Sequence, residues 1–282
     1  MYSSIFRANI FSDRVFVVTG GGSGIGRCVA HELASLGAGI ALVGRNRDKL
    51  EAVAKELAPT AVGLSIHSCD VRDQEAVIGA VDQIIQQHGR MDGLVNNAGG
   101  QFPALLEHIS VKGWDAVVRT NLYAPFIVSL ACYKAWFKDH GGSIVSVLAD
   151  FWGSMPGMGH SGAARAGTKS FTETAALEWA ASTVRVNAVA PGWIESSGLE
   201  SYPESYRDEI ARWPALVPLQ RLGTTAEVSA AIVFLLSDAA AFITGTTLRV
   251  DGGVPNVRPH WPARIGRATP HYSGFPEPPA QV

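Results

Sequence analysis

The stretch Val15–Gly26, VFVVTGGGSGIG, decides the fold of this 282-residue chain. Its first part, Val15–Thr19, is apolar and rich in β-branched residues, which is typical of a buried strand. After the glycines, Val29 and Leu33 recur at helical spacing before the pattern stops at Gly37. The stretch therefore predicts a strand, a glycine-rich turn and a helix in direct succession.

The glycine-rich turn is predicted to bind phosphate groups. Glycines allow the backbone to turn tightly and to approach a pyrophosphate, and the following helix N-terminus offers free N–H groups and a positive dipole end. A merely flexible turn is the alternative, but the position between a strand and a helix favours a dinucleotide site. The predicted cofactor contacts in this turn are Gly20, Ser23, Gly24, Ile25 and Gly26.

Strand and helix patterns alternate from Val15 to Val250, without a second core or an internal repeat. Such alternation predicts right-handed βαβ units, and hence an α/β fold with a Rossmann-type doubly wound parallel sheet of about seven strands. Helices should cover both faces, giving a three-layer α/β/α single domain. The further predicted strands are Ile40–Val43, Leu64–Cys69, Gly93–Val95, Ser143–Leu148, Val184–Val189 and Thr246–Val250.

Three segments need separate predictions. Residues 110–137 are expected to hold two helices, with Asn121 between flanking apolar runs, and residues 195–222 to form an irregular or short-helical flap. The domain is predicted to cover residues 1–254. Residues 255–282 carry seven of the fifteen prolines and no hydrophobic period, which predicts a Pro-rich C-terminal arm.

Composition excludes several classes of partner. The net charge of −2 gives no electrostatic reason to expect nucleic acid or an anionic membrane surface. Cys28, Cys69 and Cys132 are far apart and form no CxxC pair, so reduced thiols are expected and a metal site is not. No stretch has the length of a membrane span, and the N-terminus lacks the apolar run of a signal peptide. A cytoplasmic protein is the resulting expectation.

Arg45 follows the second predicted strand, where folds that prefer NAD usually carry a carboxylate for the ribose hydroxyls. A cation at this position suits a 2′-phosphate, so the sequence predicts NADP(H) in preference to NAD(H). Alternatively, Arg45 and the nearby Arg47 simply begin the next helix and face water.

The carboxyl ends of the other strands should complete the cofactor site. Asp70 is expected either to hydrogen-bond the adenine edge or to cap the helix that begins near Asp73. Small residues and side-chain amides follow the fourth strand, as expected of a crevice lined by ligand. The further predicted cofactor contacts are Val71, Asn97, Ala98, Gly99, Arg165, Pro191, Gly192 and Ile194.

Taken together, these motifs resemble the short-chain dehydrogenase/reductase family. The matching pieces occur in order and with the family's spacing over about residues 10–254. The resemblance implies a nicotinamide cofactor and a homotetramer built on the helices around 121–139 and 161–181. The pieces are Thr19–Gly26, Asp70–Val71, Asn96–Gly99, Asn121, Pro191–Gly192 and Val250–Gly253.

The family's catalytic residues are a Ser at the end of the fifth strand and a Tyr-x-x-x-Lys pair in the next helix. The resemblance places Ala149 at the Ser position, Ser161 at the Tyr position and Arg165 at the Lys position. A Ser hydroxyl is a far weaker acid than a tuned phenol, and an Arg does not deprotonate in proteins. The site is therefore expected to be poor at carbonyl/alcohol exchange, which indicates another hydride acceptor.

One branch of the family accommodates this departure. The chain resembles the 2,4-dienoyl-CoA reductases and, more closely, the peroxisomal trans-2-enoyl-CoA reductases. The runs that resemble the latter are His160–Gly167, Ala176–Ala180 and Gly100–Phe102. The resemblance implies NADPH-dependent reduction of the carbon–carbon double bond of an enoyl or dienoyl thioester, with acyl-CoA as substrate. The positions of the enoyl reductase's own Tyr and Lys are occupied here by Lys169 and Glu173.

In this chemistry, negative charge builds on the thioester oxygen, and Asn121 and Ser161 are the predicted hydrogen-bond donors to it. Arg165 would supply a positive field and bind ribose hydroxyls. Asp150 lies where the dienoyl reductases carry an acid–base residue, so it is the predicted proton source; water as the source and a loop-capping role for Asp150 are the alternatives. Two other functions stay open: an alcohol/aldehyde dehydrogenase of terpenoid type, and a non-catalytic NADP(H)-binding protein.

Overall fold

A seven-stranded parallel sheet forms the centre of the computed structural model, which describes residues 2–199, 202–257 and 266–275. The strand order is β3-β2-β1-β4-β5-β6-β9, so the chain winds outward in both directions from β1 and β4. This arrangement confirms the predicted doubly wound fold. The strands are β1 (Val15–Thr19), β2 (Gly39–Gly44), β3 (Leu64–Ser68), β4 (Gly93–Asn96), β5 (Gly142–Val147), β6 (Val184–Pro191) and β9 (Thr247–Val250).

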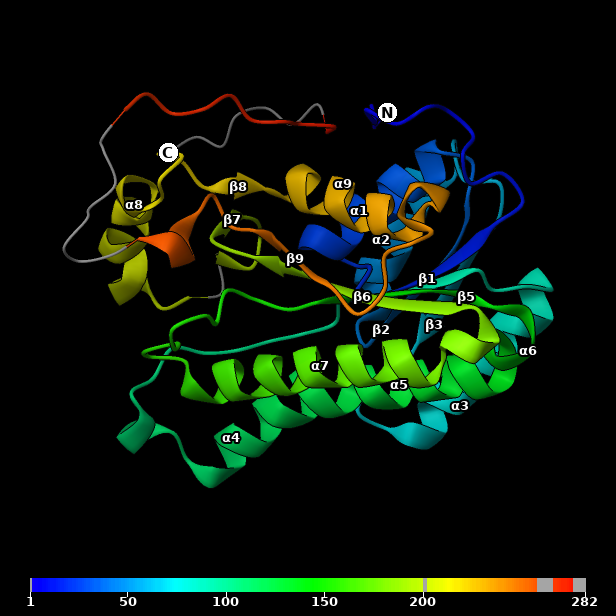
Figure 1. Cartoon of the computed structure of the whole chain (residues 1–282), viewed down its shortest axis with the longest axis horizontal. Coiled ribbons are helices and arrows are strands. Elements are labelled where there is room, and N and C mark those ends of the chain that lie inside the picture. The colour runs from blue at the N-terminus through cyan, green and yellow to red at the C-terminus, as the bar shows by residue number, and fades with distance from the viewer. Residues whose placement is uncertain (1, 200–201, 258–265, 276–282) are drawn as a thin grey trace.

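Helices cover both faces of the sheet (Figure 1). On one face lie α1 (Gly24–Ser35), α2 (Arg47–Leu57) and α9 (Thr225–Leu236). On the other lie α3 (Gln74–His88), α7 (Gly159–Glu178) and a long helical run over residues 111–140. Because both faces are covered, β1 is buried along its whole length, which explains its continuous apolar sequence.

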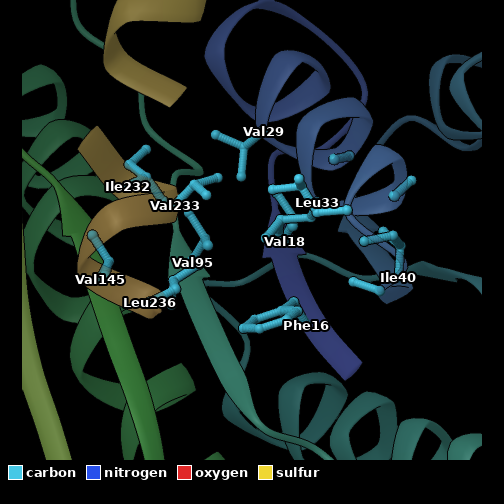
Figure 2. Packing of buried hydrophobic residues seen from close by; sticks show 14 of the residues in the cluster. Phe16, Val18, Val29, Leu33, Ile40, Val95, Val145, Ile232, Val233 and Leu236 are labelled. Carbon is cyan, nitrogen blue, oxygen red and sulfur yellow. The ribbon is translucent and has the colours of Figure 1, made fainter. Parts of the chain in front are cut away.

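The first of these faces holds the largest group of fully buried side chains (Figure 2). Val29 and Leu33 of α1 meet Ile232 and Val233 of α9 above β1, and all four are inaccessible to solvent. This contact fixes the start of α1 relative to the sheet, and the start of α1 is where the predicted phosphate site lies.

The helical run over residues 111–140 is continuous, so the predicted division into two helices is wrong. It consists of α4 (Val111–Val118), α5 (Ala124–Cys132) and α6 (Lys138–His140), joined by π-helical turns at Arg119–Tyr123 and Tyr133–Phe137. The wider turn still satisfies the backbone, because the Asn121 carbonyl accepts a hydrogen bond from the Thr168 hydroxyl (2.7 Å).

Among the described residues, this run alone has the length and apolar composition of a membrane span. However, 44% of its most apolar window is buried within the protein, and Figure 1 shows the run lying in the helical layer beneath the sheet. A core helix passes the same test, so the run is weak evidence for a membrane span.

The segment after β6 is more regular than predicted. It contains a short parallel pair, β7 (Ile194–Glu195) with β8 (Gly223–Thr224), and a ten-residue helix, α8 (Arg207–Leu216). Thr224 then begins α9 with a capping box, because its hydroxyl accepts from the Glu227 N–H while the Glu227 carboxylate accepts from the Thr224 N–H. Short 3₁₀ turns occupy Leu106–His108, Ala180–Ser182, Glu204–Tyr206, Asp238–Ala240 and Val254–Asn256.

The described residues of the C-terminal arm are 255–257, which finish the 3₁₀ turn at Val254–Asn256, and 266–275, which have neither helix nor strand and lie against the N-terminal segment (Figure 1). The Ser3 N–H donates to the Gly274 carbonyl (2.8 Å), and the Phe275 ring packs edge-on against Tyr2. Thr224 donates its hydroxyl to the Tyr272 carbonyl (2.7 Å), which ties the arm to the end of β8. The arm's other residues, 258–265 and 276–282, lie outside the described residues, and the domain boundary at 254 stays a prediction.

The glycine-rich turn and α1 approach each other at Gly26. A Cβ atom there would lie 2.4 Å from both the Gly20 carbonyl oxygen and the Asn97 side-chain nitrogen. Only glycine permits this approach, which brings the first turn of α1 directly against the loop after β4.

Replacing Gly26 by Ala should therefore lower the free energy of unfolding by about 2 kcal/mol, because a backbone must move to admit the methyl group. Gly79→Ala is the matched control: Gly79 lies inside α3 with open space around it, so the same change should raise stability by about 0.5–1 kcal/mol. Urea denaturation followed by circular dichroism measures both. Equal stability of Gly26→Ala and the unaltered protein would contradict the close approach.

Candidate active site

A cavity of about 1100 Å³ runs along the carboxyl ends of the strands. Its lining begins at the glycine-rich turn, passes the loop after β4 and ends under the segment that carries Tyr202 and Trp213. Most of the predicted site residues line it, although they come from the ends of six strands and, for Arg165, from α7. They are Gly20, Ser23, Gly24, Ile25, Arg45, Asp70, Val71, Asn97, Ala98, Gly99, Asp150, Arg165, Pro191, Gly192 and Ile194.

The N-terminus of α1 opens into this cavity. Ser23 precedes the helix in an extended conformation, and its side chain makes no capping hydrogen bond to the described helix. The first turn holds no acidic residue, and Gly24 adopts a positive φ of 53° that favours glycine. Uncapped N–H groups at the positive end of a helix dipole fit a pyrophosphate. Gly26, by contrast, does not line the cavity, so its predicted contact is replaced by the packing role described above.

Two basic side chains line the cavity just beyond the carboxyl end of β2. Arg45 and Lys49 are both exposed there. Arg47 does not line the cavity; it forms an ion pair with Glu51 one turn further along α2 (2.8 Å). Lys49 was not predicted, because it reaches the cavity only through the position of α2, which its spacing in the sequence does not reveal.

Asp70 lines the cavity but is held by Arg72 in a two-pronged ion pair, with Oδ2 2.6 Å from the Arg72 Nη2. This contact lowers the pKa of the Asp70 carboxyl below its ordinary value. The cap of α3 is Asp73, whose carboxylate accepts from the N–H groups of Glu75 and Ala76. Asp70 therefore does not cap the helix and stays available at the cavity wall.

Asn97 fastens the loop after β4 to the glycine-rich turn. Its side-chain N–H groups donate to the Thr19 and Gly20 carbonyls at 3.0 and 3.2 Å. The Thr19 hydroxyl in turn accepts the backbone N–H groups of Asn97 and Ala98. Asn97 therefore lines the cavity and also fixes the relative position of the two loops that border it.

Arg165 is the buried cation of the site. Its Nη1 donates to the Val147 carbonyl at 2.6 Å, while its buried Nε has no partner among the described residues. Burial lowers the pKa of the guanidinium to about 10, so it stays protonated at neutral pH. A buried charge with one donor unused is costly unless a ligand accepts from it. Arg165 and the open α1 N-terminus together fit an anionic dinucleotide.

Asn121 and Ser161 do not line the cavity, and both are fully buried. The Asn121 amide binds Gly100 twice, donating to its carbonyl (2.7 Å) and accepting from its N–H (3.1 Å). The Ser161 hydroxyl donates to the Gln101 side-chain oxygen (2.6 Å). The predicted donation of these groups to substrate does not fit this arrangement, because loop residues 100–101 already occupy them.

Asp150 lies where β5 leads into the cavity, held by a hydrogen bond from its N–H to the Pro191 carbonyl (2.9 Å). Its Oδ1 is buried and has no partner within the described part of the chain. Burial raises the pKa of the carboxyl, and the nearby Asp251 raises it further, although a backbone contact at Trp152 opposes the shift. The contact with the Trp152 N–H is one that a loop-capping Asp makes, so both the proton-source role and the loop-capping role of Asp150 stay predictions.

Two other polar residues of α7 face away from the cavity. His160 is fully buried against the Phe102 ring (4.5 Å) and accepts the Ser161 N–H through Nδ1, so it is neither solvent-facing nor part of the cavity wall. Lys169 forms an ion pair with Glu173.

The wall opposite α7 comes from the segment after β6. Trp193 stacks on Trp213 at 5.1 Å, and Tyr202 packs edge-on against Trp213. Tyr202 also accepts a hydrogen bond from the side-chain nitrogen of Gln101, which lines the cavity too. Gln101 was absent from the predicted site residues, although the run of amides and small residues after β4 pointed to this loop.

Comparison with known proteins agrees with this site. The family described as enoyl-(acyl carrier protein) reductase matches residues 20–255. The peroxisomal 2,4-dienoyl-CoA reductase of Danio rerio is 37% identical over 257 residues, covering 89% of this chain and 85% of the relative. The probable 2,4-dienoyl-CoA reductase of Bacillus subtilis (strain 168) is 38% identical over 244 residues, covering 85% and 96% respectively.

Among solved structures, the citronellol catabolism dehydrogenase AtuB of Pseudomonas aeruginosa PAO1 is 51% identical. It superposes with a TM-score of 0.81, covering 90% of this chain and 100% of that one. The matches extend from the glycine-rich turn to the last strand and so include every element that borders the cavity. This chain therefore belongs to the short-chain dehydrogenase/reductase family of NAD(P)-dependent oxidoreductases.

Proposed function

We propose that this chain is an NADPH-dependent reductase of the carbon–carbon double bond of an enoyl or dienoyl thioester. The proposal is carried by the environment of Ser161, the residue that the family resemblance aligns with the catalytic Tyr. Its hydroxyl is buried, bonded to Gln101 and absent from the cavity wall. A carbonyl reductase needs an acid–base hydroxyl there, whereas reduction of an activated double bond does not. The identity to 2,4-dienoyl-CoA reductases supports the same substrate class.

The bound cofactor would supply the hydride. Arg165 holds a positive charge at the cavity wall, and its unused Nε–H would be available to a hydroxyl of the cofactor ribose. Asp150 supplies the proton that the substrate carbon must gain, directly or through one water molecule. Its partnerless Oδ1 and raised pKa suit this role, since a carboxyl must be protonated in order to act as an acid.

A second candidate function is oxidation of a branched acyclic alcohol of the citronellol type. The observation in its favour is the 51% identity to AtuB, a dehydrogenase of citronellol catabolism. A third, non-catalytic NADP(H) binding, would need the cavity but neither Asp150 nor a substrate.

We further propose that the substrate is an acyl-CoA, that the protein is cytoplasmic and that it forms a homotetramer. Apolar side chains exposed on the outer helical layer support the assembly: Tyr123, Phe126 and Leu177 lie on the helices that the family resemblance assigned to subunit contacts.

Purified protein mixed with NADPH should oxidise it when 2-enoyl-CoA or 2,4-dienoyl-CoA is added, as followed at the absorbance of NADPH. Citronellal with NADPH, and citronellol with NADP⁺, test the second candidate in the same instrument. Turnover of citronellol or citronellal without any turnover of thioesters would reject the proposed function. NADPH binding without turnover of any compound would favour the non-catalytic alternative.

Arg45→Ala should weaken binding of NADPH by roughly 10–100-fold, because one charge-assisted bond to the 2′-phosphate is lost. Binding of NADH, which lacks that phosphate, should hardly change. Arg47→Ala is the control, since Arg47 is paired with Glu51 and does not line the cavity. Fluorescence titration gives the Kd values. Equal losses for NADPH and NADH would remove Arg45 from phosphate recognition.

Asp150→Asn should lower kcat by about a hundredfold, the usual scale of general acid catalysis. The pKa of Asp150 is raised, so its protonated form predominates below that pKa and is lost as pH rises through it. The unaltered enzyme should therefore lose activity with rising pH, whereas the variant should lack this dependence. A kcat–pH profile of both proteins decides; an unchanged profile in the variant would exclude Asp150 as the acid.

A further inference from the structure

A chain of hydrogen bonds crosses the site from α7 to the segment after β7. The Ser161 hydroxyl donates to Gln101 Oε1 at 2.6 Å, and Gln101 Nε2 donates to the Tyr202 hydroxyl oxygen at 3.3 Å. Ser161 is fully buried, whereas Gln101 and Tyr202 line the cavity. This series of hydrogen bonds therefore begins at the residue that the family resemblance aligns with the catalytic Tyr, and it ends on a different hydroxyl, that of Tyr202, in the cavity lining.

The first bond fixes the direction of the second. Because Ser161 donates, it holds the carbonyl oxygen of the Gln101 side chain, and the amide N–H₂ must then face Tyr202. Tyr202 thus accepts from Gln101 and keeps its own O–H free to donate. The one acceptor found for that O–H among the described residues is the Met158 sulfur at 3.8 Å, which is a weak acceptor.

Met158 itself lines the cavity and directly precedes α7. A substrate oxygen entering here is a much stronger acceptor than a thioether, so it would take the Tyr202 hydrogen bond from the sulfur. The ring of Tyr202 is held edge-on by Trp213 at 6.1 Å, which limits the positions that its hydroxyl can take. Burial raises the pKa of the phenol, so Tyr202 would act as a hydrogen-bond donor and not as an acid.

We propose that Tyr202 is the catalytic residue that hydrogen-bonds the substrate oxygen on which negative charge develops. Gln101 and Ser161 act as positioning residues. They orient the Tyr202 hydroxyl, and their own donors are used in the hydrogen bonds that do so. This inference rests on the proposed function, because it assigns the donor for the thioester oxygen that Asn121 and Ser161 were first expected to supply.

Tyr202→Phe tests the assignment in the full-length protein, with Tyr133→Phe as matched control. The control also deletes a hydrogen-bonded phenol, because Tyr133 contacts Ser182 at 3.0 Å, far from the cavity lining. Loss of one preorganised donor should lower kcat of Tyr202→Phe about a hundredfold, with the Kd of NADPH and the melting temperature unchanged. Tyr133→Phe should keep the unaltered kcat.

The Ser161→Ala variant tests whether Ser161 positions the Tyr202 hydroxyl or only stabilises the fold. It should lower kcat less than Tyr202→Phe does, and adding it to Tyr202→Phe should cause no further loss, because both act through one hydroxyl. Fully additive losses would overturn the relay through Gln101. A Tyr202→Phe variant with more than half of the unaltered kcat, or with NADPH affinity falling in step with kcat, would overturn the role of Tyr202.

These outcomes are distinct from failure of the proposed function. If the unaltered protein reduces citronellal but no thioester, the thioester function fails, and a hundredfold loss in Tyr202→Phe on citronellal would still support Tyr202 as the oxygen's donor. Absence of turnover with every compound would overturn both proposals.

Discussion

The close approach of α1 to the glycine-rich turn is the constraint on which the site depends. At Gly26 no side chain separates the helix from the Gly20 carbonyl, and the Asn97 amide occupies the remaining space. This contact joins β1, α1 and the loop after β4 into one rigid corner. The buried apolar side chains between α1 and α9 hold these three elements in their relative positions. Residues as distant in sequence as Ser23 and Gly99 are consequently presented to one cavity.

The charged side chains in and beside the cavity differ in whether a neighbouring side chain pairs with them. This difference distinguishes groups that hold the structure together from groups that are available to a ligand. Asp70 is neutralised by Arg72, and Arg47 by Glu51, so these groups cost little in the absence of ligand. Arg165 and Asp150 each retain a buried polar atom without a partner among the described residues. Such atoms are destabilising in the free protein and become favourable only when a ligand supplies the missing hydrogen bond. Of the five buried side-chain atoms without a hydrogen-bond partner in the described residues, these two belong to residues that line the cavity, whereas those of His160, Thr247 and Asp251 do not.

Sequence patterns predicted the strands, the layers and most of the cavity lining, because those features follow from local periodicity and from the rule that parallel strands end at one edge. They did not predict the side-chain directions of Asn121 and Ser161, which are set by loop residues 100–101. They also missed the π-helical turns and the β7–β8 pair, since both depend on contacts between distant segments. Gly26 was assigned to cofactor contact because its role in packing becomes visible only once Asn97 is in place.

The described part of the C-terminal arm also has a practical consequence. Tyr272 accepts a hydrogen bond from Thr224, the residue that both ends β8 and begins α9, and its N–H donates to Glu227. The Arg221 side chain reaches back to the Thr269 carbonyl (2.9 Å). Residues 269–272 of the arm thereby stabilise the β7–β8 pair beside the cavity. The N-terminal segment packs against the same arm, through Ser3 and Tyr2. Substitutions in residues 2–6 or 269–275 should therefore disturb the strand pair beside the cavity, although neither segment lines the cavity itself.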